Sequence, residues 1–262
     1  MSTYRLDLHI HTRETSFCGR TKGQVVTELY KKAGYDGIVI TDHYNKGYFR
    51  RLPTWMTWEE KIDRFLRGYR SAYEEGEKIG LKVFLGIELK FNKSPREFLV
   101  YGIDEAFLKD HPELYKLNLE KFRRLVDSLA PTYKILIFQA HPFRPGNTPA
   151  DPGLLDGVEV YNGNPRQNSN NELAFSFAKK HNLKMISGSD FHRLPDLARG
   201  GVIFRQTIKE PADLTAALES GAHYQLITKT TVPFSFLRLA TLLVNQVKKI
   251  RRSKTPRCDP LM

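Results

Sequence analysis

The chain has 262 residues, of which 40% are hydrophobic, and this composition excludes a predominantly disordered protein. Its two cysteines, Cys18 and Cys258, are too few for a disulfide framework. A formal net charge of +12 favours an anionic ligand such as a phosphate, a nucleotide or a nucleic acid.

The sequence contains neither of the usual membrane-targeting patterns. No basic region followed by an apolar stretch opens the chain, so we expect no secretory signal peptide. The nearest candidate for a membrane span, residues 233–247, is interrupted by Arg238 and is shorter than the roughly 20 residues needed. We therefore expect no transmembrane segment and a cytoplasmic location, where thiols stay reduced.

The first half of the chain alternates predicted strands with predicted helices. Short or alternating apolar runs predict strands at residues 3–10, 37–41, 82–89 and 97–103. Helical spacing predicts helices at residues 24–34 and 57–80, and Thr57 with Glu60 forms a capping box at the start of the second.

The same rhythm continues in the second half. Strands are predicted at residues 134–140, 157–162, 184–189 and 200–204, and helices at residues 113–130, 170–182 and 212–221. This alternation predicts parallel βα units. Roughly seven such units would either close into a barrel or form an open sheet, and periodicity does not distinguish the two.

Five predicted strands end in histidines or acidic residues. These residues, in chain order, are His9, His11, Asp42, His43, Glu88, His141, Asp190 and His192. The carboxyl ends of parallel strands face one crevice, so we expect the side chains to converge there. A single strand-end histidine is usually structural, and Asp42 could merely cap a loop. The whole set instead predicts a metal site, whose mixed imidazole and carboxylate donors suit Zn²⁺, Mn²⁺ or Fe²⁺ better than Ca²⁺.

These residues lie in five of six short motifs that occur along the chain. The motifs are DLHIHT (7–12), TDH (41–43), GIE (86–88), AHP (140–142), GVEVYNGN (157–164) and SGSDFH (187–192). With them the chain resembles the PHP (polymerase and histidinol phosphatase) domain over about its first 205 residues. The resemblance implies an α/β fold, a distorted TIM-like (β/α)7 barrel, and two or three divalent ions that hydrolyse phosphoesters. It also implies that the metal ligands are His9, His11, His43, Glu88, His141, Asp190 and His192.

Two positions depart from the family pattern. Many members have an aspartate or histidine where this chain has residues 16–17, and we predict that nearby Glu14 replaces that ligand. The alternative is that Glu14 pairs with Arg13 or Arg20. Members also often have a histidine where Glu97 opens the strand at 97–103, and we predict that Glu97 binds metal in its place.

The predicted reaction is hydrolysis of a phosphomonoester or phosphodiester, with metal-bound hydroxide as the attacking group. Asp42 would orient a ligand. Arg144 and Arg193 would bind phosphate oxygens, which guanidinium groups match well, and Arg13 and Arg20 are weaker candidates for the same role. Cys18 lies near the first motif, but the sequence identifies no base to pair with it, so we interpret it as a packing residue.

Several interpretations of substrate and domain organisation remain open at this point. The positive charge and the aromatic and basic residues at 44–58 favour a nucleotide or short oligonucleotide as substrate. The alternatives are a histidinol- or sugar-phosphate phosphatase, an amidohydrolase, and a non-catalytic, metal-poor binding module. We predict the PHP-type barrel over residues 1–230. Residues 231–262 are predicted to form an amphipathic helix and a basic tail that could contact nucleic acid or an anionic membrane surface.

Overall fold

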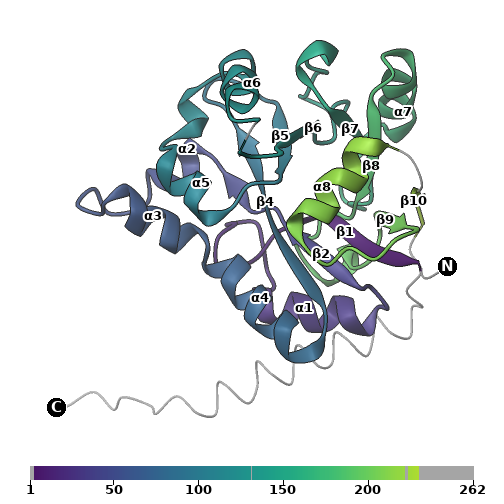
Figure 1. The fold of residues 1–262 in the computed structure, drawn as a ribbon, viewed down its shortest axis with the longest axis horizontal. Coiled ribbons are helices and arrows are strands. Elements are labelled where there is room, and N and C mark those ends of the chain that lie inside the picture. Colours follow the sequence, from purple (N-terminus) through teal and green to yellow (C-terminus); the bar gives the residue numbers. More distant parts are fainter. Residues whose placement is uncertain (1–2, 131, 222–223, 230–262) are drawn as a thin grey trace.

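The computed structural model describes residues 3–130, 132–221 and 224–229 (Figure 1). Its strands are β1 (Tyr4–Ile10), β2 (Gly37–Ile40), β3 (His43–Tyr44), β4 (Lys82–Lys90), β5 (Glu97–Tyr101), β6 (Leu136–Gln139), β7 (Gly157–Asn162), β8 (Lys184–Gly188), β9 (Gly201–Phe204) and β10 (Tyr224–Ile227). Its α-helices are α1 (Gly23–Lys32), α2 (Lys46–Phe49), α3 (Trp58–Phe65), α4 (Arg67–Ile79), α5 (Glu105–Asp110), α6 (Leu119–Ser128), α7 (Asn171–Lys180) and α8 (Pro211–Ser220). Short 3₁₀ helices form at Leu114–Lys116, Pro152–Leu154 and Leu194–Asp196. The predicted helix and tail at 231–262 lie outside the described residues, so that domain boundary stays a prediction.

The strands form one mixed sheet that curls into a nearly closed barrel. The strand order is β10-β9-β1-β2-β4-β5-β6-β7-β8, and β3 also pairs with β4. The chain just beyond β8, at one end of this order, meets β1 where Phe191 forms a parallel bridge with Ile10. There the N–H of His11 donates to the carbonyl of Phe191 at 2.9 Å. The predicted α/β barrel is thus confirmed, and its closure lies beside the first histidine pair.

The sheet is not wholly parallel, and the prediction of parallel βα units is wrong for two strands. β5 runs antiparallel to both β4 and β6, and β9 runs antiparallel to both β1 and β10. Only residues 91–96 connect β4 to β5. A parallel connection needs about a dozen residues or more, so this loop is too short for one.

Two predicted helices have different bounds in the structure. The helix predicted at 57–80 is interrupted at Leu66 and forms α3 and α4. The predicted capping box is confirmed, because the N–H of Thr57 donates to Glu60 and the N–H of Glu60 donates to Thr57. The helix predicted at 113–130 begins only at Leu119, where the Asn118 side chain accepts the N–H of Lys121 at 2.9 Å.

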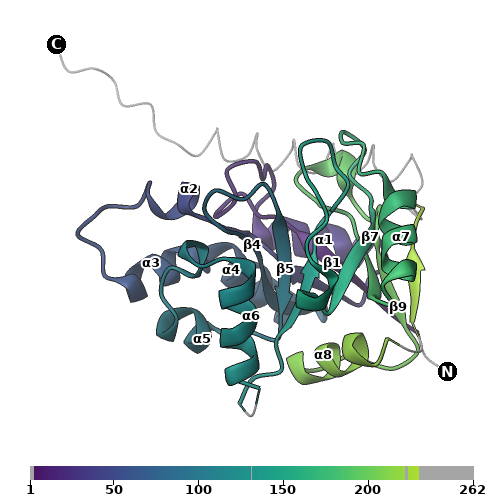
Figure 2. The same cartoon turned by 90° about the horizontal axis from the view of Figure 1, so that it is seen from above.

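Helices surround the sheet and fix the position of its strands. α1 and α4 pack against each other beside β1 and β2 (Figure 1). An apolar cluster inside the barrel joins residues of β1, β2, β4, β5, β6, β8 and β9, and α8 covers it at one end (Figure 2). Within the described ranges, no helix combines the length and apolar character needed to cross a bilayer.

Gly68, in the first turn of α4, allows this helix to approach the strand ends closely. A Cβ atom at this position would overlap Oγ1 of Thr12 and would lie 2.9 Å from Oδ2 of Asp42. Thr12 donates to Asp42 through both its backbone N–H (2.7 Å) and its hydroxyl (2.6 Å). The absence of a side chain at Gly68 therefore leaves room for a buried polar contact behind the candidate site.

We expect Gly68→Ala to lower the free energy of unfolding by about 1–3 kcal/mol, because overpacking outweighs the roughly 1 kcal/mol that alanine gains over glycine in a helix. Urea denaturation of both proteins measures this difference. Gly153→Ala is the control, since its new Cβ would meet no atom nearer than 3.4 Å. An unchanged or raised stability in Gly68→Ala would show that the contact with Thr12 relaxes without cost.

Candidate metal centre

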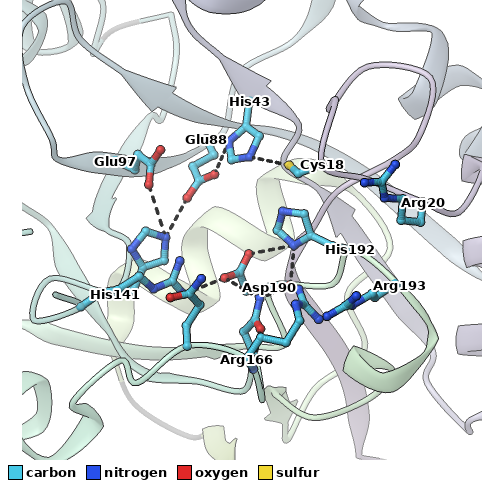
Figure 3. A pocket seen from close by; sticks show the side chains of 13 residues that line it. Cys18, Arg20, His43, Glu88, Glu97, His141, Arg166, Asp190, His192 and Arg193 are labelled. Atoms are coloured by element: carbon cyan, nitrogen blue, oxygen red, sulfur yellow. Dashed lines mark hydrogen bonds and ion pairs between the residues drawn. The ribbon is translucent and has the colours of Figure 1, made fainter. Parts of the chain in front are cut away.

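The predicted ligands, with the exception of Glu14, converge at one end of the barrel. Their donor atoms form four sets of three, and within each set the three atoms lie within 4.8 Å of one another. The sets are His11, His43 and His192; His9, His11 and Asp190; His9, Glu88 and His141; and His43, Glu88 and Glu97. Neighbouring sets share members, so they form one continuous cluster with room for more than one ion. Figure 3 shows the side of this cluster that faces a pocket.

Glu88 lies at the centre of the cluster and contacts four imidazoles. Its Oε1 is 3.0 Å from Nε2 of His141 and 3.4 Å from Nε2 of His9. Its Oε2 is 2.6 Å from Nδ1 of His43 and 3.5 Å from Nε2 of His11. Glu88 is only 1% exposed, and although Nδ1 of His43 lies 2.6 Å from Oε2, no group of the described chain gives this oxygen a well-aligned hydrogen bond. A buried carboxylate oxygen in this state is costly unless a cation neutralises it, so the site fits divalent metal ions.

The hydrogen bonds of His9 and His11 show which nitrogen of each ring remains available to bind a metal. Nδ1 of His9 lies 2.8 Å from the carboxylate of Glu159 and donates to it. Nδ1 of His11 lies 3.2 Å from Oγ of Ser16, whose own hydrogen is donated to Asp42. Both Nε2 atoms therefore have lone pairs, and they face each other at 3.1 Å. Two facing lone pairs repel unless a cation lies close to both, which is the arrangement of a metal-binding pair.

Asp190 closes the other side of the cluster. Its Oδ1 lies 3.4 Å from Nε2 of His11, and its Oδ2 accepts from Nη2 of Arg144 at 2.7 Å. The guanidinium of Arg144 thus holds a ligand in place, while its contact with phosphate remains a prediction. Asp190 (φ 51°) and His141 (φ 30°) both have a left-handed backbone conformation. Such conformations cost on the order of 1 kcal/mol or more and concentrate at functional sites.

The ionisation of these groups follows from burial and from their neighbours. Burial alone would raise the pKa of Glu88, but the charges of His43 and His9 outweigh it and hold that pKa well below its usual value. Burial, together with His43 and His192, lowers the pKa of His11. Burial opposes protonation of His9, but Glu159, Asp190 and Glu88 raise its pKa. A divalent ion attracted by the same carboxylates would displace that proton, so metal affinity should rise with pH.

Asp42 lies behind the ligands rather than in the pocket. It is 3% exposed and accepts the hydroxyl hydrogens of Thr12 and Ser16, each at 2.6 Å. Ser16 in turn accepts from His11 and from the backbone N–H of His43 at 3.1 Å. Asp42 therefore acts on two ligands through Ser16, which fits the orienting role predicted for it. Many family members have a metal ligand at the position of Ser16. Here Ser16 instead holds the ring of His11, a predicted ligand, in place.

The two predicted replacement ligands differ in position. Oε2 of Glu97 lies 3.7 Å from Nε2 of His141, and its other oxygen accepts from Lys90 at 3.1 Å, so Glu97 is part of the cluster. Glu14 is not brought to the cluster. Its carboxylate accepts the N–H of Gly23 at 3.1 Å, at the start of α1, where the helix dipole favours a negative charge.

A pocket of about 420 Å³ opens onto the cluster (Figure 3). Four arginines line it: Arg20, Arg144, Arg166 and Arg193. Arg166 pairs with Asp196, whereas no described carboxylate pairs with Arg20 or Arg193. Residues Arg166, Asn164 and Gln167 also line the pocket but were not predicted from the sequence.

Cys18 also lines this pocket, and the interpretation of Cys18 as a packing residue is wrong. It is exposed, and its Sγ lies 3.2 Å from Nε2 of His43. Burial opposes ionisation of the thiol, but hydrogen bonds to His192 and His43 outweigh that effect and lower its pKa to about 6. The sequence could not pair Cys18 with His43, since 25 residues separate them.

Glu159 lies in the motif at residues 157–164, but the sequence alone predicted no role for it. It is fully buried in β7, where it accepts from His9 and, through Oε2, from the N–H of His141 and the amide of Asn162, both at 3.0 Å. The available signal was a charged residue between Val158 and Val160 in an otherwise apolar strand. A buried carboxylate behind a ligand histidine fixes its tautomer and raises its basicity.

We expect Glu159→Gln to weaken divalent metal binding by about 10–100-fold. Glu159 accepts hydrogen bonds from His9, His141 and Asn162, so the N–H group of the new amide would face a donor and disturb the orientation of His9. Competition with a chromogenic chelator measures this affinity. Glu172→Gln, an exposed change in α7, is the control. Equal affinities in both variants would show that Glu159 has no part in orienting His9.

Comparisons with known proteins agree with this geometry. The sequence profile of the PHP domain matches residues 7–189, and the PHP-associated profile matches residues 168–223. No curated protein matches the sequence. PsfC from Pseudomonas syringae PB-5123 has a similar solved structure, with a TM-score of 0.62 and 15% identity, covering 94% of this chain and 100% of PsfC.

A second solved structure shares the fold. It is a two-domain protein from Bacteroides vulgatus ATCC 8482 that contains a predicted PHP-like metal-dependent phosphoesterase. Its TM-score is 0.61 at 20% identity, covering 87% of this chain and 65% of that one. Since the PHP profile matches well over half of the sequence and the motif residues converge on one cluster, the chain belongs to the PHP domain family.

Proposed function

We propose that this protein is a metal-dependent phosphoesterase that hydrolyses a phosphomonoester or phosphodiester, with a nucleotide or short oligonucleotide as the first candidate substrate. The observation that carries the proposal is the buried carboxylate of Glu88 among four imidazoles, at the base of a pocket lined by arginines. Family membership and the phosphoesterase description of the Bacteroides vulgatus protein support the same reaction class.

The overlapping donor sets support two or three divalent ions, with Mn²⁺, Zn²⁺ and Fe²⁺ as candidates. When bound, such ions neutralise phosphate charge and activate a water molecule as nucleophile. The chain's own contribution is orientation: Glu159 and Ser16 direct Nε2 of His9 and His11, and Arg144 holds Asp190. Arg20 and Arg193, which pair with no described carboxylate, are available to phosphate oxygens at the mouth of the pocket.

The nucleotide proposal depends on where a base could stack. Within segment 44–58, Tyr44, Tyr48 and Phe49 are buried and not available, whereas Trp55 is 77% exposed but does not line the pocket. Phe17 offers a different surface, because it is 56% exposed next to Cys18 and the guanidinium carbon of Arg51 lies 3.9 Å from its ring centre. An exposed ring paired with arginine suits a nucleobase. The predicted contact of the basic tail with nucleic acid concerns residues outside the described ranges, and the cytoplasmic location stays a prediction.

A histidinol- or sugar-phosphate phosphatase is the second candidate, and one observation favours it. The described lining of the pocket contains no aromatic side chain other than histidine, and most of it is charged or polar. Such a lining suits a hydroxyl-rich substrate. The amidohydrolase alternative is not supported at Lys90, the lysine nearest to Glu88 in sequence, because it forms an ion pair with Glu97 at 3.1 Å.

We expect the purified protein with added Mn²⁺ or Zn²⁺ to release phosphate from at least one member of a panel of nucleotides, 3′,5′-bisphosphonucleotides, sugar phosphates, histidinol phosphate and short RNA. The double variant His9→Ala/Asp190→Ala should lose at least about 100-fold in rate, since both residues contribute to one donor set. The preferred substrate separates the two candidates. Metal binding without turnover of any substrate would contradict the phosphoesterase proposal, and failure to bind metal would leave a binding module.

We expect Arg193→Ala to lower kcat/KM by about 10–100-fold, mainly through a higher KM, because a charge-assisted hydrogen bond to phosphate contributes about 1.5–3 kcal/mol. Steady-state kinetics on the best substrate measure both constants. Arg205→Ala, an exposed change outside the pocket, is the control. An Arg193→Ala enzyme with unchanged KM would remove Arg193 from the substrate-binding group.

A further inference from the structure

Cys18 lies in the loop between β1 and α1, and its thiol faces the pocket (Figure 3). Its Sγ is 3.2 Å from Nε2 of His43, and His192 lines the same pocket. These two histidines form, with His11, a set of three donor atoms that lie within 4.8 Å of one another, and the sulfur lies beside this set through its contact with His43. The cysteine is therefore the third member of a group of nitrogen and sulfur donors rather than an isolated thiol.

The two imidazoles have their remaining nitrogens engaged elsewhere. Nδ1 of His192 donates to the carbonyl of Asp190 at 2.8 Å, which leaves Nε2 with a lone pair. Nδ1 of His43 lies 2.6 Å from Oε2 of Glu88, and this leaves Nε2 of His43 facing the sulfur. Two Nε2 atoms and one sulfur are thus directed at one region on the pocket side of the cluster.

The loop that carries Cys18 is attached on both sides of the thiol. Before it, Ser16 donates to Asp42 at 2.6 Å, and after it the N–H of Arg20 donates to the carbonyl of His192 at 2.7 Å. Gly19 allows the close approach that this path requires, since a Cβ there would lie 2.5 Å from the carbonyl oxygen of Thr12. The sulfur is consequently held near His43 and His192 before any ion binds.

We propose that Cys18 is a metal ligand and that, with His43 and His192, it forms a His₂Cys site open to the pocket. Three protein ligands with a fourth position open to substrate are typical of catalytic zinc sites. A thiolate is a soft ligand that favours Zn²⁺ over Mn²⁺ and Mg²⁺, whereas a carboxylate at this position would not. The proposal rests on the metal-dependent function proposed above and specifies which ion one of its sites selects.

Cobalt substitution tests the proposal with a readout that does not depend on activity. A thiolate bound to Co²⁺ gives an intense charge-transfer absorption in the near ultraviolet, whereas imidazole and carboxylate ligands give only weak visible bands. The chain's other cysteine, Cys258, is removed by Cys258→Ser, and that protein is the reference. We expect Co²⁺ to produce the charge-transfer band in Cys258→Ser and not in Cys18→Ser/Cys258→Ser. The double variant should also retain about one Zn²⁺ fewer per chain.

A second measurement uses the reference protein without spectroscopy of the metal. Zn²⁺ should slow alkylation of Cys18 by iodoacetamide at least about 10-fold, because a zinc-bound thiolate is shielded. Visible cobalt bands without the charge-transfer band, together with unprotected alkylation, would overturn the role of Cys18 and leave the phosphoesterase proposal standing. No cobalt binding at all would overturn both. Loss of turnover in Cys18→Ser with unchanged metal content and spectrum would instead place the thiol on the substrate and refute the ligand role.

Discussion

The buried carboxylate of Glu88 is the constraint on which the rest of this structure depends. A charge at 1% exposure is tolerated only where cations or strong donors compensate it, and here four imidazoles surround it. These imidazoles come from β1, from β3 and from the turn after β6, so the ends of those elements must meet within a few ångströms. The pairing of His43 with Glu88 between β3 and β4, and the closure of the barrel at Ile10 and Phe191, achieve this. The barrel therefore closes beside Glu88 and the imidazoles that surround it.

The residues behind the candidate ligands determine which nitrogen of each imidazole is free to bind a metal. An imidazole binds a metal through the nitrogen that lacks hydrogen, and that choice is made by the group behind the ring. Glu159 makes it for His9, the Asp42–Ser16 pair makes it for His11, and the carbonyl of Asp190 makes it for His192. The left-handed backbone at Asp190 belongs to the same arrangement, since it turns a side chain back towards the cluster at a cost in local stability.

The sequence allowed the convergence of the candidate ligands to be predicted because their positions follow from simple geometry. His9 and His11 share a direction two residues apart, and the other ligands end strands that face one crevice. Glu159 and Cys18 could not be assigned in this way, because their roles depend on contacts across 150 and 25 residues respectively. The antiparallel direction of β5 does not follow from strand–helix alternation, which predicts parallel strands. It follows from the length of the connection between β4 and β5, because the six residues 91–96 are too few for a parallel crossover. Glu14, selected by proximity in sequence, instead accepts the first N–H of α1, which shows that loop residues near a motif need not point into its site.

The chemistry of the cluster changes from one end to the other. Glu88, Glu97 and His141 provide carboxylate oxygens and one nitrogen, a combination that Mn²⁺ and Fe²⁺ accept well. At the opposite end His43, His192 and the sulfur of Cys18 provide softer donors. His43 joins the two ends, because one of its nitrogens faces Glu88 and the other faces Cys18. An imidazole hydrogen can occupy only one of these nitrogens in the neutral ring, so the ring cannot offer lone pairs to ions at both ends at once. An ion at the proposed Cys18 site would therefore require the hydrogen of His43 to lie on Nδ1, and the contact of Nδ1 with the carboxylate of Glu88 favours that tautomer.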